Sequence, residues 1–401
     1  MIDSTLVTLN AGSSTVKLGL FRMVPQGPVE LLRGVISFHD DPLRLRIDDA
    51  NGRHDHALDV RPGADIQAVM AATLDRLAGH ADMRKVRVVG HRVVHGGDGF
   101  SGPAVLSPAV VAALDRLTPY APLHQGQSLD LVRAIHALRP DLLQTASFDT
   151  AFHQSNADLV RRYAIPRALH DQGIKRYGFH GLSYKYIAAR LAGQGETGKA
   201  VIAHLGSGAS LCAIEGGKSR DTSMGFSTLD GVPMATRCGV LDPGVVLHLL
   251  EYGGEDPHSL REMLYGRSGL LGMSGISSDS RDLLADPSPQ AAEAVAVFDF
   301  RVAGEVARLA TTLGGLDTLV FTAGIGENQP PIRAAICARL AWLGVALDDE
   351  ANAANAARIS TPDSRIRVLV IPTDEEQVIA AEAFSVIGDA PGDADGIRPP
   401  G

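Results

Sequence analysis

The chain has 401 residues, which exceeds the size at which a single hydrophobic core keeps growing, so we expect two domains. Its net charge of −9 at pH 7 argues against a protein that binds nucleic-acid phosphates, because such a protein needs a basic surface. The three cysteines are too few and too scattered for a disulfide framework or a zinc site, which is typical of a reducing compartment.

The N-terminal sequence MIDSTLVTLN has acidic and polar residues where a signal peptide would have a basic stretch and a long apolar run. No window of the chain approaches the apolar length of a membrane span. We therefore expect a cytoplasmic protein that has no membrane partner.

The N-terminal part alternates predicted strands with predicted helices. LVTLN is expected to be a strand that turns through AGSST into the returning strand VKLGLFR, and LLRGVI and LRLRID continue the strand pattern. Residues 65–79 predict an amphipathic helix, and VRVVG at 86–90 predicts a buried strand before the glycine-rich HRVVHGGDGF. Helices near 107–117 and 126–138 precede the strand TASFD at 145–149. This order of elements indicates an α/β fold.

A second block repeats the pattern of the first. VIAHLGSGASLCAIEGG is strand, small-residue turn and strand, as is TLVTLNAGSSTVKLGLF. Aligning Asn10 with His204 places Gly12 over Gly206. This short match indicates a duplicated α/β unit with one phosphate-sized turn in each copy.

Three further elements follow the second block. A long helix is expected at 289–313, between the cap residue Ser288 and the closing Gly314. TLVFTAGIGEN predicts a strand that leads into a glycine turn, and RVLVIPTDEE predicts a strand that leads into a helix.

The domain boundary is expected near residue 150. Residues 1–150 would form the first domain and 151–377 the second, and a helix at 378–387 would return to the first domain. The Gly/Pro/Asp-rich residues 388–401 are expected to be disordered.

Several segments carry residues suited to phosphate chemistry, each with an ordinary alternative. The turn from Asn10 to Lys17 has small side chains that would let a phosphate approach backbone N–H groups, although a plain hairpin turn explains it equally well. Arg92 after an apolar strand suits a carboxylate or phosphate clamp, with a structural salt bridge as the alternative. Asp149 lies at a strand end, where α/β proteins present functional groups, but a turn aspartate is the commoner explanation.

Histidines and a P-loop-like segment are ambiguous when taken singly. His91 and His95 are expected to be hydrogen-bonded structural residues, because a strand does not bring residues four apart together. His180 lies between an aromatic residue and a glycine, and Arg237 lies in a tight turn before a helix start. GQGETGKA at 193–200 precedes a strand and ends in alanine where a P-loop has a hydroxyl residue, so we predict a surface loop.

Taken together, the small-residue turns, the glycine turn AGIGEN, the isolated arginines and the strand-end aspartate are the parts that phosphoryl transfer needs. A nucleophile elbow, G-x-S-x-G, and a metal-binding H-E-x-x-H motif are absent from the sequence, so a hydrolase lacks its parts.

In chain order, NAGSSTVK, GHRVVHGG, LHQGQ, FDTAFH, RYGFHG, HLGSGAS, DTSMGFS, TRCGVLDPG, GISSDSRD, FTAGIGEN and TDEE resemble the acetate/propionate kinase family. The resemblance covers nearly the whole chain. It implies an α/β fold of two domains with the duplicated ribonuclease-H-like topology of actin, sugar kinases and heat-shock ATPases, and an active site in the cleft between them. It also implies a homodimer.

The activity that the resemblance implies is the reversible, direct in-line transfer of the γ-phosphoryl group of ATP to the carboxylate of acetate, giving acetyl phosphate and ADP. Mg²⁺, with Mn²⁺ as an alternative, would be the cofactor. A kinase for propionate or another short-chain acid remains an alternative, as does a sugar-kinase-like ATPase.

The resemblance also assigns roles to residues. It implies catalytic roles for Asp149, Arg92, Arg237 and His180, and contacts to Mg²⁺ for Asn10 and Glu376. The acyl substrate would contact Arg92, Val94, Leu123, His124 and Phe179. The nucleotide and its phosphates would contact Lys17, His204, Gly206, Ser207, Gly208, Asp279, Arg281, Gly324, Gly326 and Asn328.

The sequence departs from the family pattern at a few positions without losing a charged catalytic residue. These departures are Gln125-Gly126 for Asn-Pro, Ser207 for Asn, Ala235 for Gly, Val240 for a polar residue, and Thr228 for Pro at the edge of the acyl pocket.

Overall fold

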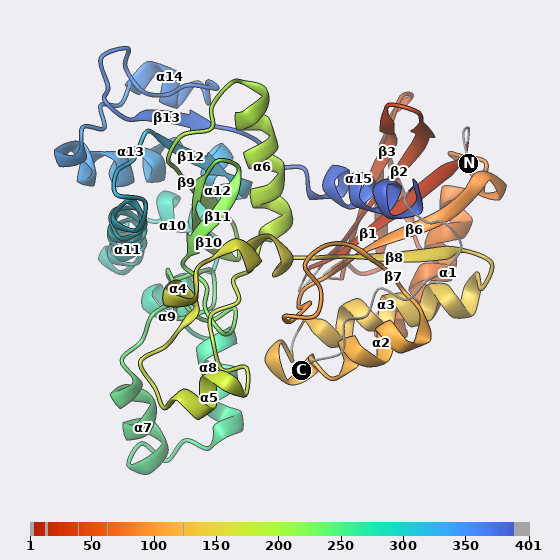
Figure 1. Cartoon of the computed structure of the whole chain (residues 1–401), viewed down its shortest axis with the longest axis horizontal. Helices are drawn as coiled ribbons and strands as arrows, with labels where there is room; N and C mark the ends of the chain where they lie inside the picture. Colours follow the sequence, from red (N-terminus) through yellow and green to blue (C-terminus); the bar gives the residue numbers. More distant parts are fainter. Residues whose placement is uncertain (1–3, 13–14, 39, 62, 123, 389–401) are drawn as a thin grey trace. The chain divides into compact units, whose positions relative to one another are not determined.

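The computed structural model describes residues 4–388 except 13–14, 39, 62 and 123. The chain forms two compact units, one running to Phe152 and resuming at Asp374, and the other comprising His153–Thr373 (Figure 1). Each unit has its own β-sheet, and the class is α/β. Among the described residues, no helix is long and apolar enough to cross a membrane.

The first unit is built on an eight-stranded sheet of order β5-β4-β3-β2-β1-β6-β8-β7. Strands β1 to β5 form an antiparallel meander, whereas β6 runs parallel to β1 and β8 parallel to β6. The strands are β1 (Thr5–Ala11), β2 (Thr15–Val24), β3 (Gly27–Ser37), β4 (Arg44–Asp49), β5 (Gly52–Ala57), β6 (Val86–Val93), β7 (Ala104–Val105) and β8 (Leu143–Phe148).

Helices cover both faces of this sheet. On one face α1 and α3 pack against Leu9, Leu18 and Leu45, and on the other α15 packs against Leu6 and Phe21. Successive strand residues point to opposite faces, so the alternation in β1 serves both cores. The helices are α1 (Ile66–Leu77), α2 (Pro108–Asp115), α3 (Gln125–Leu138) and α15 (Glu375–Gly388), with 3-10 turns η1 (Met83–Lys85), η2 (Thr118–Tyr120) and η3 (Ala151–Ser155).

The second unit is built on a five-stranded sheet of order β11-β10-β9-β12-β13. Its strands are β9 (Ala200–Leu205), β10 (Ala209–Glu215), β11 (Lys218–Thr222), β12 (Thr318–Thr322) and β13 (Arg367–Val370). Its helices are α4 (Asp158–Arg161), α5 (Arg167–Asp171), α6 (Gly181–Gly193), α7 (Pro243–Glu251), α8 (Pro257–Gly266), α9 (Gly269–Ser274), α10 (Ser280–Ala285), α11 (Pro289–Leu313), α12 (Ala323–Asn328), α13 (Pro330–Arg339) and α14 (Asp349–Ala353), with the 3-10 turn η4 (Ala341–Leu343).

The two sheets share one topology. The order and directions of β3-β2-β1-β6-β8 are repeated in β11-β10-β9-β12-β13, with an antiparallel hairpin at one side and two parallel strands at the other. The predicted duplication is therefore confirmed. In this correspondence β1 matches β9, so Asn10 and His204 lie at equivalent places.

Several predicted elements differ from the structure in type or in bounds. AGIGEN, predicted as a glycine turn, is the short helix α12. The strand predicted to end at residue 90 continues to Val93, so Arg92 lies within β6 instead of following it. The C-terminal helix begins at Glu375, three residues before the predicted start. Ser13, Ser14, Leu123 and the tail from residue 389 lie outside the described residues.

Candidate active site

In the first unit, Arg92 is the centre of a charged network. Its Nε and Nη2 atoms donate to the two carboxylate oxygens of Asp149 at 3.0 and 2.6 Å, and its Nη1 atom donates to Asn10 Oδ1 at 3.1 Å. Asp149 is fully buried, and the Arg92 side chain is partly buried, with 14% of it exposed. Parallel strands end at the same sheet edge, which is why Arg92 of β6 and Asp149 after β8 meet. The salt bridge considered as the alternative for Arg92 is therefore present.

Two glutamates share the amide of Asn10. Its Nδ2 atom donates to Glu375 Oε2 and to Glu376 Oε1, both at 2.8 Å. Glu376 was implied by the family resemblance, but Glu375 was missed. Three successive acids at 374–376, shortly after a strand that ends at Val370, were the signal that could have found it. Both glutamates come from the first turn of α15, which packs on the same sheet as Asn10.

The charges around this network are strongly coupled. Burial alone would lower the pKa of Arg92, but the carboxylates of Asp149 and Glu375 outweigh it and raise that pKa above its ordinary value. Burial raises the pKa of Glu376, Lys17 opposes this shift, and the neighbouring Glu375 adds to it. Lys17 is paired with Asn10 across the β1–β2 hairpin. The network thus gathers three acids around one guanidinium.

In the second unit, two histidines are held by serine hydroxyls. His180 Nδ1 bonds Ser210 Oγ at 2.8 Å, and His204 Nδ1 bonds Ser183 Oγ at 2.8 Å. The two imidazole rings stack with centroids 4.2 Å apart. His180 has a left-handed backbone (φ 58°), an unusual conformation that is typical of functional sites.

Arg237 and the small-residue turn lie beside His180. A Cβ atom on Gly208 would lie 3.4 Å from His180 Nε2 and 3.7 Å from Arg237 Nη1. The Arg237 Nη1 atom donates to the carbonyl of Thr228 at 3.3 Å. The Arg237 guanidinium, the His180 imidazole and the backbone of Gly208 therefore lie close together within this unit, as an anion site requires.

Gly269 positions the turn that carries Arg237, and sequence reasoning missed it. Its φ is 62°, and an added Cβ atom would lie 2.1 Å from the carbonyl oxygen of Met234 and 3.0 Å from the backbone nitrogen of Arg237. A glycine is needed here for both reasons. No local pattern marks the position, since Gly269 and Arg237 are far apart in sequence.

We expect Gly269→Ala to lower kcat by roughly tenfold or more, because the Arg237 turn must move to admit the methyl group. Backbone strain at positive φ should also cost about 1–2 kcal/mol of unfolding free energy. Gly266→Ala is the matched control, because a Cβ atom there meets nothing within 4 Å. Steady-state kinetics and thermal unfolding of both variants would check this, and equal kcat values would contradict it.

A pocket of about 440 Å³ in the second unit brings together most of the residues expected to bind the nucleotide. Its volume is within the usual range for small-molecule sites. Asp279 caps α10 and forms an ion pair with Arg281, whose side chain is largely exposed. The lining of the pocket includes six residues expected at the nucleotide, Gly206, Ser207, Asp279, Arg281, Gly324 and Asn328, together with Ala235, Ser278, Ser280, Ile325 and Gln329.

Some residues expected at the nucleotide do not line this pocket. Gly326 is buried within α12, and an added Cβ atom there would lie 3.3 Å from the backbone of Phe321. His204 and Gly208 instead lie beside His180, and Lys17 belongs to the other unit. Gln329 also lines the pocket, but it was not predicted from the sequence. Its Nε2 atom donates to Ser280 Oγ at 2.7 Å and so joins α12 to α10 at the pocket.

Comparison with known proteins matches residues 5–381 to the model of the acetokinase family. The acetate kinase of Rhodopseudomonas palustris (strain TIE-1) is 45% identical over 96% of this chain and 98% of its own length. The chain belongs to the acetokinase family. Its structure is similar to the propionate kinase of Francisella tularensis (TM-score 0.88, 34% identity) and the acetate kinase of Porphyromonas gingivalis (0.83, 35%), each aligned over 96% of this chain and all of the other.

Two departures from the acetokinase pattern have structural consequences. Gln125 is buried, accepts from His95 N at 3.0 Å and donates to His95 O at 3.0 Å, so it holds the loop after β6. Thr228 is buried, and its carbonyl oxygen accepts the hydrogen bond from Arg237 described above. Val240, by contrast, is exposed.

The residues that the family resemblance places at the acyl group belong to different units. Val94 follows β6 in the first unit and is buried, and His124 precedes α3 in that unit. Phe179 lies before α6 in the second unit, and its carbonyl oxygen bonds His153 Nε2 at 3.0 Å. His91 and His95 are buried structural residues, as predicted, and burial lowers the pKa of each to about 4.

Proposed function

We propose that this protein is an acetate kinase that moves the γ-phosphoryl group of ATP reversibly to the carboxylate of acetate, giving acetyl phosphate and ADP. The observation that carries the proposal is the 45% identity to an acetate kinase over 96% of the chain. The family match favours a carboxylate-accepting kinase over a sugar-kinase-like ATPase.

Arg92 is suited to stabilise the transferring phosphoryl group. A guanidinium has five N–H donors, and Asp149 and Asn10 occupy three of those on Arg92. Two N–H groups, one on each terminal nitrogen, remain for an anion. The transition state spreads negative charge over equatorial phosphoryl oxygens, so a positioned cation lowers its energy.

Asp149 acts in this proposal by positioning Arg92. Acetate is already ionised at neutral pH, so no general base is needed to make the nucleophile. A buried carboxylate that accepts both N–H groups of one edge of Arg92 fixes the plane of that guanidinium. In-line transfer depends on such positioning.

His180 and Arg237, which both belong to the second unit, are suited to donate to an anion. Ser210 Oγ also bonds the Tyr184 hydroxyl, so a hydrogen-bond chain can run from Tyr184 through Ser210 to His180 Nδ1. In that arrangement the imidazole proton lies on Nε2, beside Gly208 and Arg237. Nε2 would then donate to a phosphoryl oxygen, while the pocket at Asp279 and Asn328 holds the rest of the nucleotide.

The residues around Asn10 fit Mg²⁺, with Mn²⁺ as the alternative. Hard divalent cations prefer carboxylate and amide oxygens, and Glu375 and Glu376 place two carboxylates on one amide. The raised pKa of Glu376 reflects burial and this repulsion, which a cation would relieve. A bound ion supplies charge neutralisation at the phosphates. We infer that Asn10, Glu376 and Glu375 hold it.

The test is formation of acyl phosphate, trapped as hydroxamate, from ATP with acetate, propionate, butyrate, glycerol or no acceptor. We expect acetate to be the best acceptor, propionate to be used measurably and butyrate poorly, and EDTA to abolish the reaction. ADP release that is independent of a carboxylic acid would instead indicate an ATPase and would refute the proposal.

Thr228 is expected to influence the choice of acid. Proline would offer a rigid apolar wall, whereas threonine adds a hydroxyl, and one methylene in such a pocket is worth about 1–3 kcal/mol. Thr228→Pro should therefore change the propionate-to-acetate ratio of kcat/KM more than the KM for ATP. Thr228→Val, which keeps the backbone N–H, separates the hydroxyl from the backbone effect. An unchanged acid ratio with an altered KM for ATP would place Thr228 at the nucleotide.

We also infer a cytoplasmic homodimer. Helix α7 has no buried residue among those described, and it exposes Val245, Leu247 and Leu250, with Tyr252 just beyond it. An exposed helix with several apolar side chains of this kind is typical of a subunit interface. Light scattering should give twice the mass of one chain, and Leu247→Asp should shift the protein toward the monomer. A monomeric wild type would contradict this inference.

A further inference from the structure

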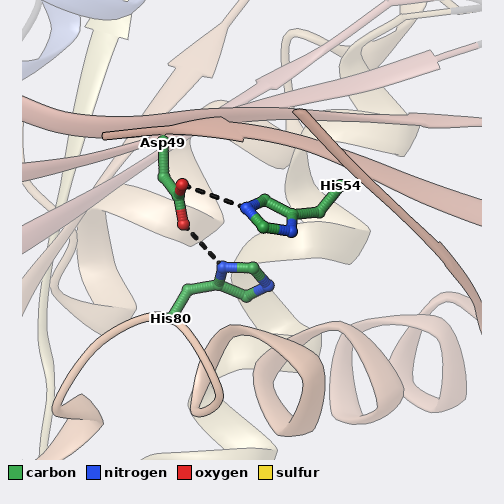
Figure 2. Close-up of side chains that lie close together, drawn as sticks. All are labelled: Asp49, His54 and His80. Carbon is green, nitrogen blue, oxygen red and sulfur yellow. Dashed lines mark hydrogen bonds and ion pairs between the residues drawn. The ribbon is translucent and has the colours of Figure 1, made fainter. Parts of the chain in front are cut away.

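The first unit contains a second group of polar side chains, outside the network at Arg92. Asp49, His54 and His80, which we call the Asp-His cluster, point toward one another (Figure 2). Asp49 Oδ1 lies 3.1 Å from His54 Nε2, and Asp49 Oδ2 lies 2.8 Å from His80 Nδ1. One candidate ligand atom from each residue lies within 4.8 Å of the others.

The fold brings these three residues together from distant positions. Asp49 ends β4 and His54 lies on the neighbouring strand β5, where it pairs with Ile47. Residues two apart on a strand share a face, so Asp49 lies on the side of Ile47 and Leu45, which is the core side covered by α1. His80 follows α1 and closes the group from the helix layer. The Asp-His cluster therefore lies at one end of the hydrophobic core between this sheet and α1.

Burial distinguishes the cluster from a chance surface contact. The side chains of Asp49 and His80 are only 8% and 10% exposed, while that of His54 is 33% exposed. Two of the candidate ligands are thus largely shielded by neighbouring residues, and the third, His54, is accessible to solvent. All three residues are partly shielded from solvent, so the packing around them restricts the positions of the Asp49 and His80 side chains.

Each buried ligand also has an outer partner. His80 Nε2, on the far side of the ring from Asp49, lies 2.9 Å from His56 Nε2. Asp49 Oδ1 accepts from the backbone N–H of Asn51 at 2.7 Å. A metal-binding histidine commonly uses its second ring nitrogen in a hydrogen bond that fixes the ring orientation, and metal-binding carboxylates are similarly supported.

We propose that Asp49, His54 and His80 bind one divalent transition-metal ion, for which Zn²⁺ is the appropriate probe. Two imidazole nitrogens and one carboxylate oxygen are ligands that Zn²⁺ accepts, with water at a fourth, open position. Mg²⁺ prefers oxygen ligands alone and does not compete for such a set. The bound ion would tie the edge hairpin β4–β5 to the end of α1.

The contrasting interpretation is a hydrogen-bonded cluster that holds no ion. A Zn²⁺ titration of the metal-free full-length protein, in the presence of millimolar Mg²⁺ and a chromophoric chelator as competitor, separates the two. We expect wild type to bind an equivalent of Zn²⁺ that Asp49→Asn and His54→Ala each bind at least tenfold more weakly. His56→Ala should weaken binding by about 10–100-fold, as loss of an outer partner does.

Controls distinguish this site from other Zn²⁺ ligands. His258 is an exposed histidine paired with Glu262, and His258→Ala should leave Zn²⁺ binding unchanged. Zn²⁺ held by Glu375 and Glu376 would persist in the cluster variants, as would acetyl phosphate formation without Zn²⁺. Circular dichroism would confirm that Asp49→Asn is folded. Wild type that binds no Zn²⁺, or binds it with the same affinity as Asp49→Asn and His54→Ala, would overturn the proposal.

Discussion

Asp149→Asn is expected to lower kcat by at least 10²–10³, about the loss seen when a transition-state donor is removed. Asparagine has nearly the volume of aspartate, but it carries no charge and accepts through only one oxygen. Arg92 would then be a partly buried cation still attracted by Glu375 and Glu376, which both accept from the Asn10 amide. We expect the guanidinium to turn toward them and lose the orientation that Asp149 imposes.

The same substitution should also destabilise the protein. Removing one partner of a buried ion pair typically costs about 3–5 kcal/mol, although the two glutamates will offset part of this loss. Asp115→Asn is the matched control, because Asp115 forms an exposed ion pair with Arg133 in the same unit. Turnover and melting temperature measured on one preparation are decisive. A variant that loses stability and keeps its kcat would show that Asp149 is only a structural turn residue.

Elements with strong local signals were predictable from the sequence. The helix at 289–313 has the predicted bounds, with Ser288 accepting from Ala291 N and Gly314 in the left-handed conformation. Its cap, first-turn proline, apolar periodicity and terminal glycine all agree with one another. The repeated strand–turn–strand pattern likewise predicted the duplicated topology, because the hairpin is a local unit.

Elements at glycine-rich segments were less predictable. AGIGEN forms α12 because Ala323 adopts φ 65° and its N–H bonds the side chain of Glu327 at 2.7 Å, which starts a helix that the glycines alone would not favour. Glu327 also accepts from Thr373 N at 3.1 Å, a contact that spans 46 residues. A local and a tertiary hydrogen bond to the same glutamate therefore support a conformation that local propensity left open.

In the candidate active site too, the residue types were predictable from the sequence but their contacts were not. Residue types near Arg92 and Asp149 were visible in the sequence, but their mutual contact depends on the register of β6 against β8. Glu375 reaches Asn10 only because α15 packs back onto β1 and β6, where an added Cβ atom on Gly90 would lie 2.8 Å from Ile379. Such contacts follow from the packing of distant segments, which no local motif encodes.

Arg92→Ala should lower kcat by about 10²–10³ with a smaller change in the KM for acetate. An interaction made only in the transition state lowers kcat and kcat/KM together, whereas one made equally with the substrate raises KM alone. Arg92→Lys keeps the charge but loses the planar fork that Asp149 binds, so it should recover little activity. Arg133→Ala is the control for loss of an arginine ion pair at the surface of the same unit.

A double-mutant cycle then tests whether Asp149 acts through Arg92. If Asp149 only positions the guanidinium, adding Asp149→Asn to Arg92→Ala should lower kcat little further, because the group to be positioned is gone. The double variant should also be more stable than the sum of the single losses predicts, since neither charge is left buried alone. Additive losses in kcat would mean that Asp149 contacts the metal or the acceptor directly. Near-normal turnover in folded Arg92→Ala would remove Arg92 from the active site.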